Sequence, residues 1–315
     1  MWLLLAFVSA TLLGFYDTSK KAALKDNAVL PVLFLNTLFS TLIFSPFIAD
    51  SILGGGMFAG TVLDPVTYPD GIPADGSGVS ASRPLLRAHL LVILKAFIVL
   101  SSWIAGYFGL KHLPITIVGP INATRPVLVL VGAMLFFGER LNWCQWTGVL
   151  LAILSIFLMS RSSKKEQIDF TRNKWIFCVA GATIMGALSG LYDKFIMKEL
   201  GPMFVQSWFN LYQLIIMTVI CALLWYPSRK ATTPFHWSWA IPLISIFIAT
   251  ADFAYFNALS APESMISVVS LVRRGSVLIS FACGVLIFKE RNLKAKAIDL
   301  LLILIGMVFI YFGSR

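Results

Sequence analysis

Charged residues are scarce in this sequence: 13% of its 315 residues are Asp, Glu, Lys or Arg, against about 25% in a typical soluble domain. Hydrophobic residues make up 58% of the chain. Such a chain cannot cover a water-exposed surface with polar side chains, so a soluble globular protein is excluded. The content of glycine, proline and cysteine is too low for a collagen-like fibre or a disulfide scaffold, and the chain is too apolar to be disordered.

Residues that carry out chemistry are also few. The four cysteines show no CxxC spacing and fall in or beside apolar segments, as small buried hydrophobes do. The three histidines lack a metal-binding spacing, and neither HExxH nor GxSxG occurs. We therefore expect no enzyme activity, no metal and no cofactor. We also expect no nucleic-acid partner, because the net charge of +10 follows a topological pattern described below.

Long apolar runs are what the sequence has instead. A membrane-spanning helix needs ~20 apolar residues. Windows of that length predict ten helices, at residues 2–24, 29–49, 88–110, 115–137, 143–160, 174–197, 203–225, 238–258, 264–288 and 295–313. No basic segment precedes the first run, so we interpret it as a structural helix and not a signal peptide. The predicted fold is an all-α membrane protein with ten transmembrane helices in the lipid bilayer.

The distribution of Lys and Arg between alternate loops predicts the orientation. Most of them fall on the side that carries Lys20, Lys164 and Lys289, which the positive-inside rule assigns to the cytoplasm. Both termini are then expected outside, together with the acidic, Gly- and Pro-rich segment 50–84. We interpret that segment as an exposed extramembrane loop, with a lid over the site as the alternative. The expected location is a bacterial inner (plasma) membrane.

The second half of the chain repeats features of the first. Segment 10–17 (ATLLGFYD) matches segment 186–193 (GALSGLYD). The fourth predicted span of each half ends alike, in FGER at 137–140 and FKER at 288–291. Three such matches in the same order, including an asparagine in each second span, are more than chance similarity between apolar segments produces.

We therefore predict two five-helix repeats, at 1–160 and 174–315, joined by a cytoplasmic linker at 161–173. Because five is odd, the two repeats insert with opposite orientation. Inverted repeats are typical of alternating-access carriers, which bind their substrate between the repeats near the middle of the membrane.

Two five-helix halves, each with a Glu-Arg ending before its last helix, resemble the EamA-type carriers of the drug/metabolite transporter superfamily. The resemblance covers nearly the whole chain, although the segment at 50–84 is longer than the family pattern. It implies a ten-helix inverted-repeat carrier with a central cavity, often one that exports amino acids or other small metabolites. It does not name a substrate.

Three arginines lie deep within predicted spans. Arg125 lies near the middle of the fourth span, and Arg273 and Arg274 lie at similar depth in the ninth, its repeat counterpart. An arginine at the bilayer centre costs about 2.5–3.5 kcal/mol, so these side chains must line a polar cavity or be paired. Guanidinium groups suit carboxylate or phosphate. Plastid sugar-phosphate translocators, relatives in the same superfamily, hold phosphate with bases on the same two helices, and this chain looks similar there. The alternative is internal salt bridges to Asp17, Asp193 or Asp252.

Two Tyr-Asp pairs occupy matching positions in the repeats, Tyr16-Asp17 and Tyr192-Asp193. Lys20 and Lys21 follow Asp17 by three and four residues, each within reach of its carboxylate. We interpret Asp17, Lys21 and Asp193 as a coupling site or gate. The alternative is ordinary helix-end charges that close one face of the bundle.

Other polar and aromatic residues within the spans are candidates for the cavity wall. Asp252 and Tyr255 share one helix face, as do Lys95, Trp103 and Tyr107 on the third span. For the asparagines, hydrogen bonding between helices explains their presence as well as substrate contact does. The predicted substrate-binding residues are Arg125, Arg273, Arg274, Tyr255, Asp252, Trp103, Tyr107, Tyr16, Asn36, Tyr192, Asn210 and Trp208.

Together these features predict a secondary active transporter that moves a small, anionic organic metabolite by alternating access between the repeats. The alternative is an exporter of amino acids or hydrophobic drugs in which the buried arginines form structural salt bridges. An arginine-lined anion channel and an inert subunit of a larger assembly are the other classes considered. The sequence leaves open proton coupling, exchange against a counter-substrate, and assembly into a homodimer.

Overall fold

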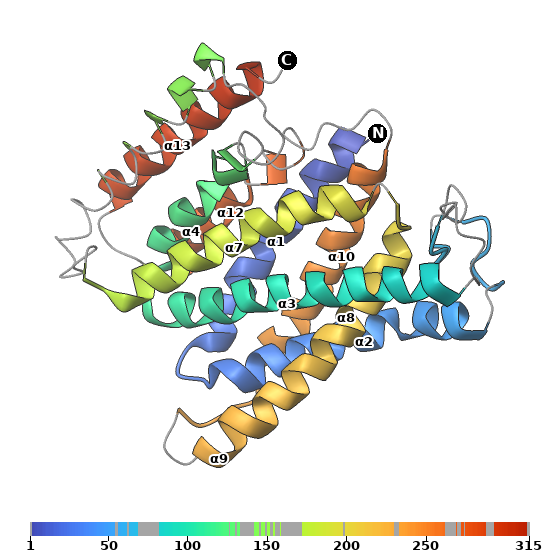
Figure 1. Ribbon diagram of the computed structural model, residues 1–315. Coiled ribbons are helices and arrows are strands. Elements are labelled where there is room, and N and C mark those ends of the chain that lie inside the picture. The colour runs from blue at the N-terminus through green and yellow to red at the C-terminus, as the bar shows by residue number, and fades with distance from the viewer. Residues whose placement is uncertain are drawn as a thin grey trace.

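The computed structural model describes residues 2–53, 56–68 without 62, 82–132 without 126 and 130, 172–229 without 198, 233–261, 275–287 and 293–313, with isolated positions at 142–158 and 269–273. In this part of the chain every regular element is a helix (Figure 1). The helices are α1 (Trp2–Leu24), α2 (Val29–Leu53), α3 (Ser82–His112), α4 (Ile115–Ala123), α7 (Lys174–Ile196), α8 (Pro202–Ile220), the π-helix η2 (Cys221–Trp225), α9 (Tyr226–Ser228), α10 (Ala240–Ser260), α12 (Ser276–Leu286) and α13 (Leu293–Gly313).

Six apolar stretches among the described residues are long enough to cross a membrane, on α1, α2, α3, α7, α8 with η2, and α10. Large apolar side chains such as Leu42, Phe97 and Leu223 point outward and are more than half exposed. Polar side chains such as Asn36 and Gln213 are fully buried. Apolar residues outside and polar groups inside are what a lipid solvent selects, since unpaired polar groups cannot face hydrocarbon. The protein is an integral, multi-pass membrane protein.

The helix bounds support six of the predicted spans, those at 2–24, 29–49, 88–110, 174–197, 203–225 and 238–258. The predicted fourth, fifth and ninth spans are described only in part, so the count of ten and the inverted arrangement stay predictions. The segment predicted as a loop at 50–84 is shorter than expected, because α2 continues to Leu53 and α3 begins at Ser82. The extension of α2 is apolar at 52–53, and its Asp50 is buried and accepts a hydrogen bond from the Met57 amide. The described residues 63–68 contact the bundle, since the Gly201 amide donates to the Thr67 carbonyl at 3.0 Å.

The main helix contacts join elements from the two halves of the chain. α1 packs mainly against α10, α3 against α7, and α2 against α8, while α4 contacts α12. Small side chains let the first two pairs approach closely. The Ser9 hydroxyl donates to the Ala251 carbonyl between α1 and α10, and the Ser102 hydroxyl donates to the Ala182 carbonyl between α3 and α7, both at 2.7 Å. In Figure 1, α13 lies at one side of the bundle, away from α2 and α8.

Candidate functional site

A cavity of about 170 Å³ lies inside the bundle, between α1, α3, α4, α7, α10 and α12. It is formed where the cross-half helix pairs meet, so both halves of the chain contribute to its wall. The polar and aromatic residues of the wall are Tyr16, Asp17, Lys20, Lys95, Ser102, Trp103, Tyr107, Asn122, Arg125, Ser189, Asp193, Phe209, Asp252, Tyr255, Phe256, Arg273 and Ser276.

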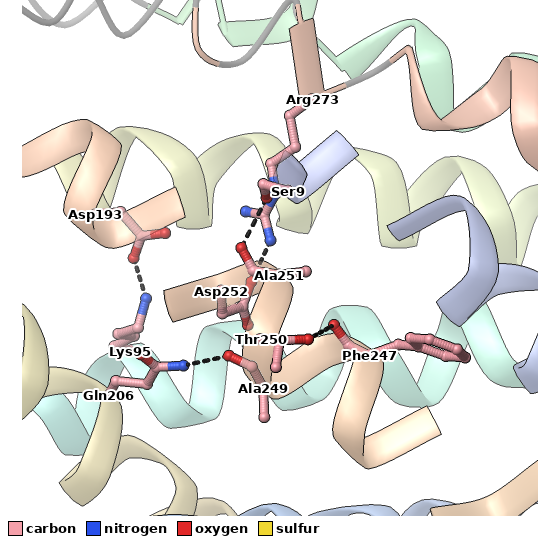
Figure 2. Close-up of polar contacts among 10 residues, drawn as sticks. All are labelled: Ser9, Lys95, Asp193, Gln206, Phe247, Ala249, Thr250, Ala251, Asp252 and Arg273. Atoms are coloured by element: carbon pink, nitrogen blue, oxygen red, sulfur yellow. Dashed lines mark hydrogen bonds and ion pairs between the residues drawn. The ribbon is translucent and has the colours of Figure 1, made fainter. Parts of the chain in front are cut away.

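The charged residues of the wall are three carboxylates and four cations. Lys95 Nζ donates to Asp193 Oδ1, and Arg273 Nη2 donates to Asp252 Oδ1; both ion pairs are drawn in Figure 2. Lys20 Nζ donates to Asp17 Oδ1 at 2.7 Å, one turn away on α1. Each carboxylate of the described wall is therefore ion-paired. Pairing is expected in a space of low dielectric, because an isolated buried charge loses far more hydration energy than a paired one.

Arg125 is the fourth cation, and no carboxylate among the described residues forms an ion pair with it. Its Nε is buried and lacks a hydrogen-bond partner in the described part of the chain. The side chain follows the end of α4, where the Thr124 amide bonds back to the Ile121 carbonyl. Its guanidinium lies against the backbone of α7 at Gly186, so close that a Cβ added there would lie 2.6 Å from Nε. Among the charged side chains of the described wall, Arg125 is thus the one without an ion-pair partner.

Aromatic rings surround the other three cations. Lys20 Nζ lies 4.3 Å from the centre of the Tyr16 ring, and Arg273 Cζ lies 4.0 Å from that of Tyr255. Lys95 Nζ lies 4.7 Å from the ring centre of Phe256. Cations over ring faces gain electrostatic stabilisation that adds to their ion pairs. The same rings give the cavity flat apolar walls between its charged groups.

The structure brings nine of the predicted site residues to the cavity. These are Tyr16, Asp17, Trp103, Tyr107, Arg125, Asp193, Asp252, Tyr255 and Arg273. The ion pair of Arg273 with Asp252 is the kind of contact that the salt-bridge alternative expected. Arg274 lies outside the described residues. What these residues bind stays a prediction.

Four predicted binding residues are not part of the cavity wall, because their helix faces meet other helices. Asn36 accepts a hydrogen bond from Ser245 at 3.0 Å, between α2 and α10. Asn210 Nδ2 donates along its own helix to the Gln206 carbonyl. Tyr192 Oη donates to the Leu91 carbonyl on α3, and Trp208 Nε1 donates to Ser51 Oγ at 3.4 Å. The contacts of these four are hydrogen bonds to the helix framework.

Lys21 was predicted to act in a gate with Asp17, but it donates hydrogen bonds to the end of another helix. Its Nζ donates to the Leu110 and Leu113 carbonyls at 2.7 and 2.6 Å. These groups belong to the last turn of α3 and the residue after it, where carbonyls lack partners within the helix and attract cations. Asp17 pairs instead with Lys20.

Two lysines of the wall, Lys20 and Lys95, were absent from the predicted site. Lys95 shares a helix face with Trp103 and Tyr107, at steps of eight and four residues, and that spacing was the signal available in the sequence. Its partner Asp193 lies on another helix, 98 residues away, so the pair itself could not be read from spacing.

Comparison with known proteins agrees with this architecture. No curated protein sequence matches the chain. One solved structure, described only as the crystal structure of a protein, is similar with a TM-score of 0.63 and 15% sequence identity, over 100% of this chain and 98% of that chain. At that identity the similarity concerns the fold alone. The profile of the EamA-like transporter family, part of the drug/metabolite transporter superfamily, matches residues 1–161. This chain belongs to the EamA-like transporter family.

Proposed function

We propose that this transporter is a secondary carrier for a small organic anion, with Arg125 as the group that receives the anionic part of the substrate. The observation that carries the proposal is the charge balance of the described cavity wall. Three of its cations are held by three carboxylates, and Arg125 is left without one. A guanidinium without a counter-charge in a site of low dielectric favours an anion, and its planar donors suit a carboxylate or a phosphate.

Arg273 has a secondary role in this proposal. Its Nη2 is engaged by Asp252, while its Nε is buried without a partner among the described residues. The side chain can offer that second edge to a ligand and keep its ion pair. Of the three arginines in the predicted anion clamp, the described residues include Arg125 and Arg273. In this proposal Arg125 binds the anion and Arg273 supports it.

Alternating access between two inverted repeats is the transport mechanism that we propose. The helix pairing supports it: if each helix of one half is exchanged for its counterpart in the other, the contacts α1–α10, α3–α7, α2–α8 and α4–α12 map onto one another. A two-fold relation between the halves produces this reciprocity. Contacts at Cys221–Leu30 and Thr41–Asn210 also fit antiparallel α2 and α8, as inversion requires. The cavity between the halves is where such carriers bind substrate.

A second candidate function is export of zwitterionic amino acids or of hydrophobic drugs. The pairing of Arg273 with Asp252 favours it, because this arginine is then a structural charge. In that case Arg125 would bind the carboxylate of an amino acid, or serve only the fold. The aromatic wall suits either class of substrate.

Counterflow in proteoliposomes tests the proposal. We expect the purified protein to exchange radiolabelled pyruvate or inorganic phosphate faster than alanine, and Arg125→Ala to abolish that exchange. Arg273→Ala and Arg274→Ala should reduce it less. Wild-type exchange of an anion by all three variants would refute the clamp. A screen of ligand-induced thermal stabilisation with phosphorylated metabolites, carboxylates and amino acids then separates the two candidate functions.

A further inference from the structure

We infer that Gly186 is a positioning residue for anion binding: its missing side chain leaves the space in which the Arg125 guanidinium sits. The inference rests on the proposed function, in which Arg125 receives the anion. Gly186 lies on α7 and is part of the cavity wall, as is Arg125.

Three contacts place α4 and the residues after it in parallel register with α7. Thr183 Oγ1 donates to Asn122 Oδ1 at 3.0 Å, and the two positions are 61 residues apart in the sequence. One helical turn further along both segments, Arg125 lies against Gly186. One more turn along, Val129 Cγ2 is 4.0 Å from where a Cβ of Gly190 would stand. The Thr183–Asn122 bond therefore fixes the register that puts the guanidinium opposite a glycine.

The Arg125–Gly186 contact does not tolerate a methyl group. A Cβ built on Gly186 would lie 2.6 Å from Nε, and closer still to Cζ and Nη2. Carbon in van der Waals contact needs about 3.5–4.0 Å. The atoms in the way belong to the end of a flexible side chain, so an alanine would displace the guanidinium and leave the helix backbone in place.

Packing, and not an ion pair, therefore sets the position of this guanidinium. Arg273, in contrast, is held by the Asp252 carboxylate and by the Tyr255 ring. Arg125 has no such carboxylate among the described residues, which keeps it available for a ligand. Gly186 thus packs against Nη2, Cζ and Nε of the guanidinium without bringing a counter-charge to it.

Gly186→Ala tests the inference, with Gly181→Ala as the matched control on the same helix, since a Cβ at Gly181 meets nothing within 4 Å. Counterflow of radiolabelled pyruvate and of inorganic phosphate should show a KM for Gly186→Ala raised on the order of tenfold, as for a misplaced charge-assisted contact. The thermal midpoint in detergent should match that of Gly181→Ala. A KM equal to that of the control would overturn the inference.

A double-mutant cycle separates positioning of Arg125 from simple helix packing. The lysine of Arg125→Lys has a compact ammonium in place of the planar guanidinium that packs on Gly186. Gly186→Ala should therefore raise KM little in the Arg125→Lys background. If glycine serves only the approach of the two helices, Gly186→Ala will raise KM equally in the arginine and lysine backgrounds, and the inference fails.

A readout without substrate keeps this inference separate from the proposed function. Phenylglyoxal modifies accessible guanidinium groups, and mass spectrometry of the peptide that contains Arg125 measures the rate. We expect faster modification in Gly186→Ala than in Gly181→Ala, because the displaced guanidinium moves into the cavity. If neither probe anion is exchanged but this difference appears, the proposed function fails and the positioning role stands. Equal rates refute the positioning role.

Discussion

Two buried polar regions of this protein differ in how completely their polar groups are paired. In the cavity, all three carboxylates of the described wall are ion-paired. On the second helix of each half, α2 and α8, uncharged polar side chains are equally buried, yet several of their atoms have no partner in the described part of the chain. We call this group the α2–α8 seam: Asn36, Ser40, Gln206, Ser207 and Gln213.

The difference follows from the energy of burial. An isolated charge in a medium of low dielectric is so unfavourable that it must be paired, whereas an unpaired amide or hydroxyl costs about 1–3 kcal/mol. The seam can therefore carry unpaired amides and hydroxyls, whereas a carboxylate in the cavity wall needs an ion-pair partner. The unpaired charge of Arg125 is the exception, and under the proposed function an anionic ligand compensates it.

The largest effect is expected where a cavity pair is broken at its most buried point. Asp193→Asn leaves Lys95 without a counter-charge, and their side chains are only 9% and 2% exposed. Removing one partner of a buried pair destabilises a protein by about 3–5 kcal/mol. We expect a large fall in the thermal midpoint of the purified protein in detergent. The double variant Lys95→Met with Asp193→Leu should recover much of the loss, and equal midpoints for Asp193→Asn and wild type would contradict this account.

Asp252→Asn is expected to lower the stability less than Asp193→Asn does, and to strengthen anion binding. The Arg273–Asp252 pair is 12% and 17% exposed, so its loss should cost about 1.5–3 kcal/mol, the value of a hydrogen bond to a charged group. Arg273 then becomes a second uncompensated cation in the cavity. A unit charge about 10 Å from an anion, at an effective dielectric constant of about 20, lowers its KM roughly tenfold.

Pyruvate counterflow measures the change in KM, and Asp252→Glu is the control that keeps the charge. A lower KM for Asp252→Asn supports the charge balance of the cavity as the basis of substrate choice. If the KM for pyruvate rises and the KM for alanine is unchanged, the result favours a structural role for the Arg273–Asp252 pair.

The sequence predicted the helices well because their signal is local. The predicted spans at 2–24 and 174–197 match α1 and α7 within a residue, since apolar runs of membrane length end at clusters of polar residues. The extension of α2 to Leu53 was missed because Gly54–Gly56 and the acids after it indicated a loop from residue 50 onward.

The site was predicted only in part, because helical spacing gives a face but not the helix that it meets. Arg125 and Arg273 were expected inside the bundle as charges that lipid excludes, and both line the cavity. Asn36 and Asn210 were equally polar and equally deep, yet they belong to α2 and α8 and make hydrogen bonds within the framework. Which of two polar faces lines a cavity depends on contacts between distant segments, and no local pattern records these.

The smallest effect has the opposite sign and concerns the seam. Gln213 is fully buried, and neither Nε2 nor Oε1 has a partner in the described part of the chain. Gln213→Leu removes both unpaired atoms at similar volume, so we expect the thermal midpoint to rise, by about 1 kcal/mol in free energy of unfolding. Ser245→Ala, which removes the hydrogen bond to Asn36, is the matched variant and should lower it by a similar amount. If Gln213→Leu is destabilising instead, the seam amides are satisfied in the membrane, and the contrast with the cavity is one of charge alone.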